Sequence, residues 1–231
     1  MDTVRSYGSA PYRALVLHGG PGAPGCAAGL CRGLQECGIS VLEHLQQGKT
    51  AAELMAEMLD ILDAHGVERI TVVGHSYGAW LALLFAAKHP RRVEKTVLLG
   101  CGPLEETYLP QLIETRAQRK AQGLSDTDNY CALPGSSGDM LYFDKAQHIS
   151  LMEEMTALRK SGELLKTALS VPGKITAIHG AYDPHPAQAL RVLAEKASEF
   201  ELHVLEKCGH DPWKERYARE AFFELLAREI V

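Results

Sequence analysis

The sequence lacks a hydrophobic run long enough to cross a membrane. Its 231 residues contain no apolar stretch that approaches the roughly 20 residues of a transmembrane helix. The segment from Met1 to Pro11 is polar and lacks the apolar centre of a signal peptide. We therefore expect a cytoplasmic protein that has no membrane partner.

An excess of basic residues is also absent. Lys and Arg together number 24 against 29 Asp and Glu, so the formal net charge is −5. The basic residues form no block or stripe that would attract a phosphate backbone. These properties argue against nucleic acid as a partner.

The six cysteines form no Cys-x-x-Cys pair and have no zinc-finger spacing. In a cytoplasmic chain, we expect them to be free thiols that pack as small apolar side chains. Cys26, Cys31 and Cys37 lie close together in the sequence, so a zinc or redox site there is the alternative. We expect no metal and no organic cofactor.

Short apolar runs alternate with helix-like patterns along most of the chain. Hydrophobic residues make up 46% of the sequence, which suffices for the core of one large α/β domain or two small ones. The runs that we expect to be strands lie at 13–17, 39–42, 69–73, 93–99, 174–179 and 201–205. Strands separated by helices predict a mostly parallel, twisted sheet of about six strands with helices on both faces.

The alternation breaks between residues 104 and 171. This segment has helix-like patterns but no convincing strand, and its middle is polar and rich in Gly and Ser. A connection of this length is usually a functional insertion rather than a simple crossover. We therefore expect an α/β core made of residues 1–103 and 172–231, with 104–171 inserted into it.

The most informative stretch is Gly74-His75-Ser76-Tyr77-Gly78. It follows the apolar run Ile70 to Val73 and precedes a run of good helix formers from Ala79 to Ala87. A Gly-x-Ser-x-Gly motif between a strand and a helix is typical of a nucleophile elbow. Its glycines let the strand and helix approach closely, and its serine stands at the positive end of the helix dipole. We predict that Ser76 is a nucleophile and that His75 is structural.

A serine hydroxyl needs a base within hydrogen-bond reach, and the base needs an acid that orients it. In a parallel sheet these partners should follow later strands, at the same edge. Asp183 follows the strand expected at 174–179, and His210 follows the strand expected at 201–205. The chain order Ser, Asp, His is the order that accompanies a nucleophile elbow. We therefore predict a triad of Ser76, His210 and Asp183.

Simpler interpretations exist for the acid and the base. A histidine in a loop is more often a surface residue, and Asp183 could instead cap the helix that follows it. Glu105 and Glu106, just after the strand expected at 93–99, are rival acids. The placement of Asp183 and His210 after two separate strands favours the triad.

Acyl transfer also requires N–H donors for the negative oxygen that develops on the substrate. One should be the backbone N–H of Tyr77, the residue after the nucleophile. The loop after the first strand should supply the other, because Gly19 and Gly20 leave its backbone exposed, and we predict the N–H of Gly20. The same loop could be only a tight turn. A mononucleotide-binding loop is disfavoured because neither a Gly-x-Gly-x-x-Gly nor a Walker pattern is present.

Together these residues resemble the α/β-hydrolase family. The resemblance covers nearly the whole chain through His18-Gly19-Gly20-Pro21-Gly22, the elbow, Asp183 and His210. The family places a helical cap over the active site, so the resemblance implies that residues 104–171 form a small cap that gates the substrate. The His-Gly-Gly-Pro-Gly motif is similar to that of the prolyl iminopeptidase branch, whose members remove N-terminal residues from peptides.

The chain departs from the family pattern in three respects, one of which is its short cap. It begins almost at the first parallel strand, so we expect the N-terminal antiparallel strands that are usual in the family to be missing. The segment Glu43 to Lys49 stands where the family usually has Asp-x-Arg-Gly-x-Gly-x-Ser. An aminopeptidase also needs acidic cap groups for the substrate ammonium, and Glu105, Glu106, Glu153 and Glu154 are the candidates.

The resulting hypothesis is a serine hydrolase that acts on a small acyl substrate through an acyl-enzyme. It takes two forms, an aminopeptidase of the proline iminopeptidase kind or a carboxylesterase of small esters. The alternative is a non-hydrolytic protein of the same fold, either a lyase or a ligand-binding receptor. The complete set of Ser76, Asp183 and His210 argues against a pure binder. The expected partner is a small molecule or a short peptide.

Overall fold

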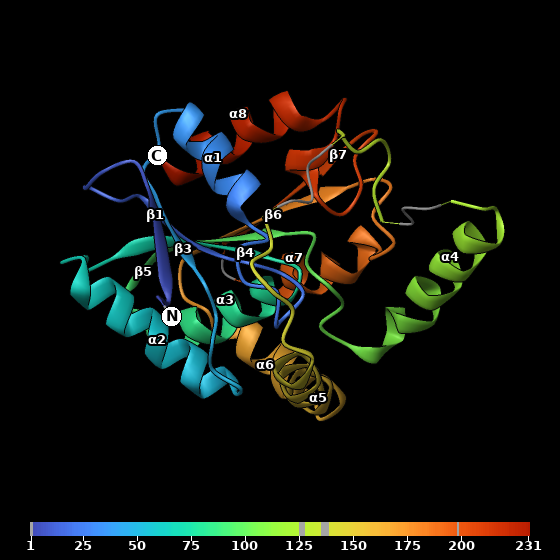
Figure 1. The fold of residues 1–231 in the computed structure, drawn as a ribbon. Coiled ribbons are helices and arrows are strands. Elements are labelled where there is room, and N and C mark those ends of the chain that lie inside the picture. The colour runs from blue at the N-terminus through green and yellow to red at the C-terminus, as the bar shows by residue number, and fades with distance from the viewer. Residues whose placement is uncertain (1, 125–127, 135–138, 198) are drawn as a thin grey trace.

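The computed structural model of the protein describes residues 2–124, 128–134, 139–197 and 199–231. These residues contain one sheet of seven strands in the order β1-β3-β2-β4-β5-β6-β7 (Figure 1). The strands are β1 Val4–Tyr7, β2 Ala14–Leu17, β3 Val41–His44, β4 Ile70–His75, β5 Val93–Leu99, β6 Lys174–Gly180 and β7 Glu199–Leu205. All neighbours pair in parallel except β1 and β3. The predicted α/β fold with a mostly parallel sheet is confirmed.

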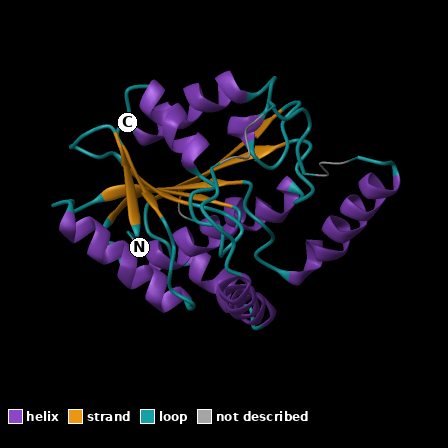
Figure 2. Ribbon diagram, in the orientation of Figure 1, coloured by secondary structure: helices purple, strands orange, loops and turns teal. Residues whose placement is uncertain are grey.

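Helices cover both faces of the sheet (Figure 2). The α-helices of the described residues are α1 Ala28–Glu36, α2 Ala51–Ala64, α3 Tyr77–Lys88, α4 Leu109–Ala121, α5 Lys145–Lys160, α6 Glu163–Leu169, α7 Arg191–Lys196 and α8 Arg219–Ile230. Short 3₁₀ helices lie at η1 Glu106–Tyr108, η2 Ala187–Leu190 and η3 Pro212–Lys214. On one face, buried side chains of α2, α3 and α6 share a cluster with strand residues such as Leu15 and Val72. On the other, α1 and α8 do the same with Val16 and Val73.

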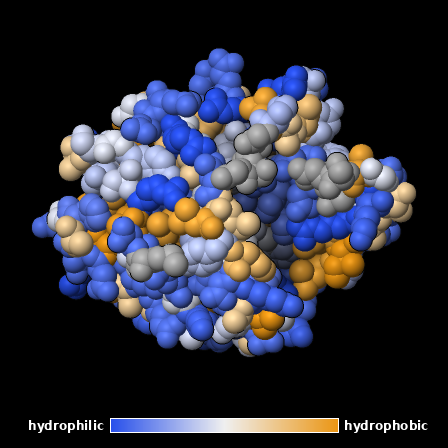
Figure 3. Space-filling view, in the orientation of Figure 1, coloured by the Kyte–Doolittle hydropathy of each residue, from blue (hydrophilic) through white to orange (hydrophobic). Residues whose placement is uncertain are grey.

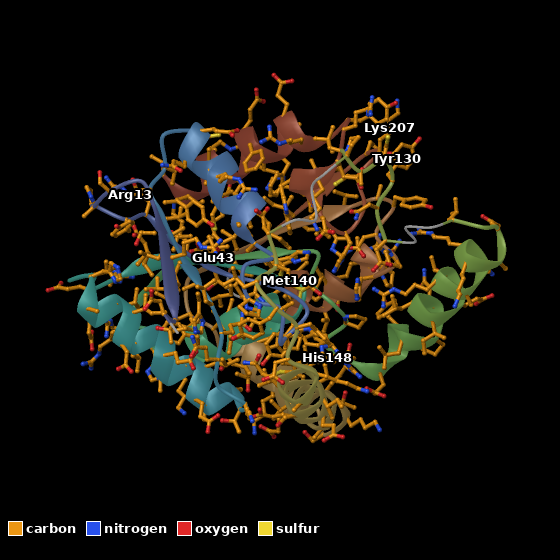
Figure 4. The ribbon with its side chains drawn as sticks, viewed as in Figure 1. Arg13, Glu43, Tyr130, Met140, His148 and Lys207 are labelled. Carbon is orange, nitrogen blue, oxygen red and sulfur yellow. The ribbon has the colours of Figure 1, made fainter. Side chains whose placement is uncertain are left out.

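The N-terminal edge of the sheet corrects one prediction. We expected the antiparallel strands of the family to be missing, but β1 pairs antiparallel with β3, with Val4 opposite His44. Only four residues long, β1 contains the polar pair Arg5 and Ser6, so it lacks the apolar run that signals a strand. A buried partner holds it, because the Tyr7 hydroxyl donates to Glu43 at 2.8 Å. Glu43 is labelled in Figure 4.

The C-terminal segment supplies a second correction, because its amphipathic pattern predicts one helix from Trp213 to Ile230. The chain instead forms η3, leaves helical geometry at Glu215 with φ −80° and ψ 129°, and begins α8 at Arg219. The side chain of Glu215 is fully buried and engaged with distant backbone, as described below. Tertiary contacts therefore override the local helical pattern.

Between β5 and β6 the chain forms η1, α4, α5 and α6. Leu151 and Met155 of α5 and Leu164 of α6 belong to the same buried cluster as α3. In contrast, α4 lies apart from the sheet in Figure 1, and Leu112 is its one buried residue. The surface is hollowed between α4 and the rest of the molecule (Figure 3). In the described part of the chain, no helix combines the length and apolar character needed to span a bilayer.

Candidate active site

Ser76 lies at the turn between β4 and α3, with φ 53° and ψ −115°. A positive φ is strained for a residue that has a Cβ, and such strain clusters at functional sites. A Cβ on Gly74 would collide with the backbone of Gly78, and a Cβ on Gly78 with the backbone of Leu17. The two glycines of the motif therefore let the chain turn so sharply that Ser76 stands directly before the first residue of α3.

Asp183 and His210 lie together in the loops that follow β6 and β7. The Nδ1 atom of His210 donates to Oδ2 of Asp183 at 2.9 Å, and both side chains are buried. Two backbone contacts hold His210, whose N–H donates to Asp128 at 2.8 Å and whose carbonyl accepts from Nε2 of His75 at 3.0 Å. Among the described residues no hydrogen bond joins Ser76 Oγ to His210. In free enzymes this contact often tightens only when substrate binds.

The charges of this pair favour an ionised acid. Burial by itself would raise the pKa of Asp183, but the nearby His210 and the hydrogen bonds from His185 and His210 hold that pKa well below its usual range. For His210, burial lowers the pKa, while the charge and hydrogen bond of Asp183 outweigh burial and raise it to about 9. His75 stays neutral because burial, followed by the His210 charge, lowers its pKa to about 3. An anionic carboxylate thus stabilises the protonated form of the His210 imidazole, and His210 acts as a base only in its neutral form.

A second imidazole contacts the same carboxylate. Nδ1 of His185 donates to Oδ1 of Asp183 at 2.9 Å, and the backbone N–H of His185 donates to the same oxygen at 2.9 Å. The rings of His185 and His210 stack with centroids 4.7 Å apart. Sequence reasoning missed His185. Its position two residues after Asp183 was the available signal, because a loop can bring such a side chain back to the carboxylate.

The loop after β2 lies against the elbow. A Cβ on Gly19 would be 2.8 Å from Cβ of Ser76, so only glycine fits there. Gly20 has φ 52°, and a Cβ on it would meet no atom within 4 Å, so it borders open space. Within the described residues no hydrogen bond uses the N–H of Gly20. Tyr77 is the first residue of α3, where the N–H groups have no partner inside the helix.

Two glutamine side chains brace this loop, and sequence reasoning missed both. Nε2 of Gln46 donates to the His18 carbonyl at 3.1 Å, and Nε2 of Gln147 donates to the Gln46 carbonyl at 3.0 Å. His148, labelled in Figure 4, adds a contact from its Nδ1 to the Pro21 carbonyl at 2.9 Å. Because Gln147 and His148 belong to α5, the insertion supports the glycine-rich loop directly. No local pattern could have signalled these long-range contacts.

Glu215 braces the other side of the site. Its carboxylate accepts backbone N–H groups from Tyr130, Cys131 and Gly209, each at 2.7 Å. Gly209 precedes His210, whereas Tyr130 and Cys131 belong to the insertion. One buried carboxylate therefore ties the insertion to the loop that carries the imidazole.

A sequence profile of the family described as "alpha/beta hydrolase fold" matches residues 15–137. This chain belongs to that family. A 2-hydroxymuconate semialdehyde hydrolase of Pseudomonas putida is 28% identical over 247 residues, which cover 93% of this chain and 85% of that protein. A proline iminopeptidase of Neisseria gonorrhoeae is 32% identical over 111 residues, 41% of this chain and 35% of that protein.

The α/β-hydrolase fold is also evident from solved structures. The crystal structure of a proline iminopeptidase from Mycobacterium smegmatis superposes with a TM-score of 0.68. The match covers 98% of this chain and 93% of that one at 16% sequence identity. At this identity the likeness concerns the fold alone.

Two of the four acidic candidates in the insertion of this α/β-hydrolase are engaged with the protein. Glu106 accepts from Nε of Arg159 at 2.6 Å, and Glu154 accepts from the N–H of Ala51 at 2.8 Å. Glu153 borders a groove on α5, away from the residues of the elbow. The rival acid Glu106 thus pairs with Arg159, while Asp183 is the partner of His210.

Two side-chain groups in the described part of this α/β-hydrolase could supply three metal ligands each. They are Asp183, His185 and His210, and Glu201, His203 and Glu229. In the first group, both imidazoles already donate to the carboxylate. In the second, the ammonium of Lys174 lies 2.9 Å from Glu229 and 3.1 Å from Glu201. Neither group contains a cysteine, and the six cysteines are free thiols.

A cavity of about 410 Å³ lies between α4 and the loop that carries Asp183. Arg119 of α4 lines it, together with Asp183, Pro184 and Arg191. Arg119 also donates to the Tyr182 carbonyl at 2.7 Å. Ser76 and His210 do not line this cavity, so it borders Asp183 rather than Ser76.

Proposed function

We propose that this protein is a serine hydrolase of small acyl substrates. Ser76 attacks the substrate carbonyl, and His210 takes the hydroxyl proton and returns it to the leaving group. Asp183 stabilises the imidazolium, while the N–H groups of Gly20 and Tyr77 bind the oxyanion. Water then attacks the acyl-enzyme with His210 as the base, which restores Ser76.

One observation carries this proposal. The loops after β6 and β7 hold a buried carboxylate–imidazole pair, with 2.9 Å between Asp183 and His210, in a protein whose elbow holds Ser76 with a positive φ. Packing alone would require neither a buried ionic pair nor a strained serine, because both cost stability. A catalytic role for Ser76 would explain why the protein has both the buried ionic pair and the strained serine.

The insertion favours an ester over an N-terminal peptide bond as the substrate. An aminopeptidase must hold a substrate ammonium, and an acidic group does this only if it is free. The engagement of Glu106 by Arg159 and of Glu154 by the Ala51 N–H removes two of the four candidates. We therefore favour carboxylesterase activity on small esters over aminopeptidase activity.

A hydrolysis panel tests the proposal. It compares p-nitrophenyl esters of increasing acyl length, aminoacyl-naphthylamides and, because of the Pseudomonas putida relative, 2-hydroxymuconate semialdehyde. We expect the highest kcat/KM on a short ester, and Ser76→Ala should lower it by a factor on the order of 10⁴ or more. Naphthylamides cleaved faster than every ester would contradict the substrate assignment, and equal turnover by Ser76→Ala would contradict the mechanism.

A further inference from the structure

Two imidazoles, rather than one, donate to the carboxylate of Asp183. His185 Nδ1 lies 2.9 Å from Oδ1, and His210 Nδ1 lies 2.9 Å from Oδ2. The rings stack at 4.7 Å with 30° between their planes. A single acid and a single base would complete the proposed triad, so His185 has no role in the mechanism described above.

The backbone of His185 is held on both sides of its Cα. Its backbone N–H donates to Oδ1 of Asp183 at 2.9 Å, and its carbonyl accepts from Nε2 of His179 at 2.6 Å. Its side chain is buried. An ionised carboxylate only accepts hydrogen bonds, so His185 carries a proton on Nδ1 in this arrangement.

We propose that His185 is a positioning residue that shares the Asp183 carboxylate with His210 and thereby weakens the hold of His210 on its proton. The proposal rests on the assignment of His210 as the base in the proposed function. It does not require His185 to touch the substrate.

The physical reason is that one negative charge serves two donors. Each N–H that donates to the carboxylate stabilises its charge and reduces the potential that remains to stabilise an imidazolium. His185 can play this part only while it is neutral. Burial lowers its pKa, and although the hydrogen bond to Asp183 opposes that effect, the charge of His210 lowers it further. The two imidazoles therefore do not become charged together.

Other ionisable groups also face the side chains of Asp183, His185 and His210, and substitution of His185 leaves each of these groups in place. They are His179 on β6, His75 on β4, Asp211 beside His210, Asp128 in the insertion, Arg116 on α4, and the thiols of Cys101 and Cys208. A change in the titration of His210 after substitution can therefore be assigned to His185.

Two variants separate the donor from the ring. His185→Phe keeps a stacking ring but removes the donor, whereas His185→Asn keeps an amide N–H near the position of Nδ1 and removes the ring. We expect His185→Phe to raise the pKa of His210 by about one unit and His185→Asn to change it far less. Since the base must be neutral, one unit would slow the reaction of Ser76 with a fluorophosphonate at pH 7 roughly tenfold. His203→Phe on β7 is the matched control and should change neither quantity.

Titration of ¹⁵N-labelled histidine by NMR measures the pKa of His210 directly, and the labelling rate against pH measures its effect. A folded His185→Phe protein with an unchanged His210 titration would overturn the proposal. So would a wild-type His185 that carries its proton on Nε2, a result that needs no variant. If His185→Phe does not fold, His185→Leu serves as the donor-free variant.

The two proposals fail in different ways. If His210 titrates higher in His185→Phe but the wild type never reacts with the fluorophosphonate, the serine hydrolase proposal fails and the sharing of Asp183 stands. If Ser76 reacts but its pH profile is the same with and without the His185 donor, the sharing fails and the hydrolase proposal stands.

Discussion

At the scale of single residues, Ser76 combines a half-buried position at a helix N-terminus with an unfavourable backbone. Its φ of 53° and ψ of −115° lie in a region that glycine adopts readily and serine does not. The hydroxyl makes no hydrogen bond that caps α3. The side chain therefore adds little to stability, which agrees with the chemical role that we propose for Ser76.

This reasoning predicts the stability of two variants. The free energy of unfolding of Ser76→Gly should exceed that of Ser76→Ala by about 1 kcal/mol, because glycine relieves the backbone strain that alanine keeps. Both variants should be inactive. Urea unfolding followed by circular dichroism measures the difference, with wild type as the reference. A Ser76→Gly protein less stable than Ser76→Ala would show that the backbone at this position is not strained.

Candidate site residues could be predicted from the sequence where a side chain suited to catalysis directly follows a predicted strand. Ser76, Asp183 and His210 each follow an apolar strand, so the sequence could nominate them, and the structure brings Asp183 and His210 into contact. Their catalytic roles remain a proposal. Gln46 and Gln147 carried no such signal, because their partners lie elsewhere in the chain and a polar side chain in a helix or loop looks like any solvated residue.

At the scale of elements, the insertion braces both sides of the candidate site. Its α5 contacts the glycine-rich loop through Gln147 and His148. Its residues near Tyr130 reach the His210 loop through Glu215. These contacts mean that movement of the insertion would disturb the loop that contains Gly20 and the loop that contains His210 together.

The buried carboxylate of Glu215 provides the test at this scale. Glu215→Gln replaces one acceptor oxygen with an NH₂ group that faces backbone donors, so the free energy of unfolding should fall by about 2 kcal/mol. Proteolysis near Tyr130 should become faster. The same change at exposed Glu220 on α8 should leave both properties within error. Equal behaviour of the two variants would mean that Glu215 does not hold the insertion in place.

Most elements could be predicted because apolar periodicity and caps are local. The spacing of Thr50 and Glu53 predicts a capping box, and the structure has it at the start of α2, with Glu53 N–H donating to Thr50 Oγ1 at 3.2 Å. Strand β1 was missed because its stability comes from pairing with β3 rather than from its own four residues. The break at Glu215 was missed because distant N–H groups compensate for the lost helical geometry.

At the scale of the whole molecule, the candidate site exists only when three distant segments meet. The sheet brings the loops after β4, β6 and β7 to one edge (Figure 1), and Glu215 ties the segment near Tyr130 to the loop after β7. In the unfolded chain Ser76 is an ordinary serine with no base beside it. Reactivity of Ser76 should therefore depend on the fold as well as on the residue.

The most direct test of this account is the mass of the protein after reaction with a fluorophosphonate. We predict a single adduct on the peptide that contains Ser76, absent from Ser76→Ala and from His210→Gln, and lost when wild type is first unfolded in urea. Absence of an adduct on the folded wild type, or an adduct that persists in Ser76→Ala, would contradict the claim that Ser76 is the nucleophile.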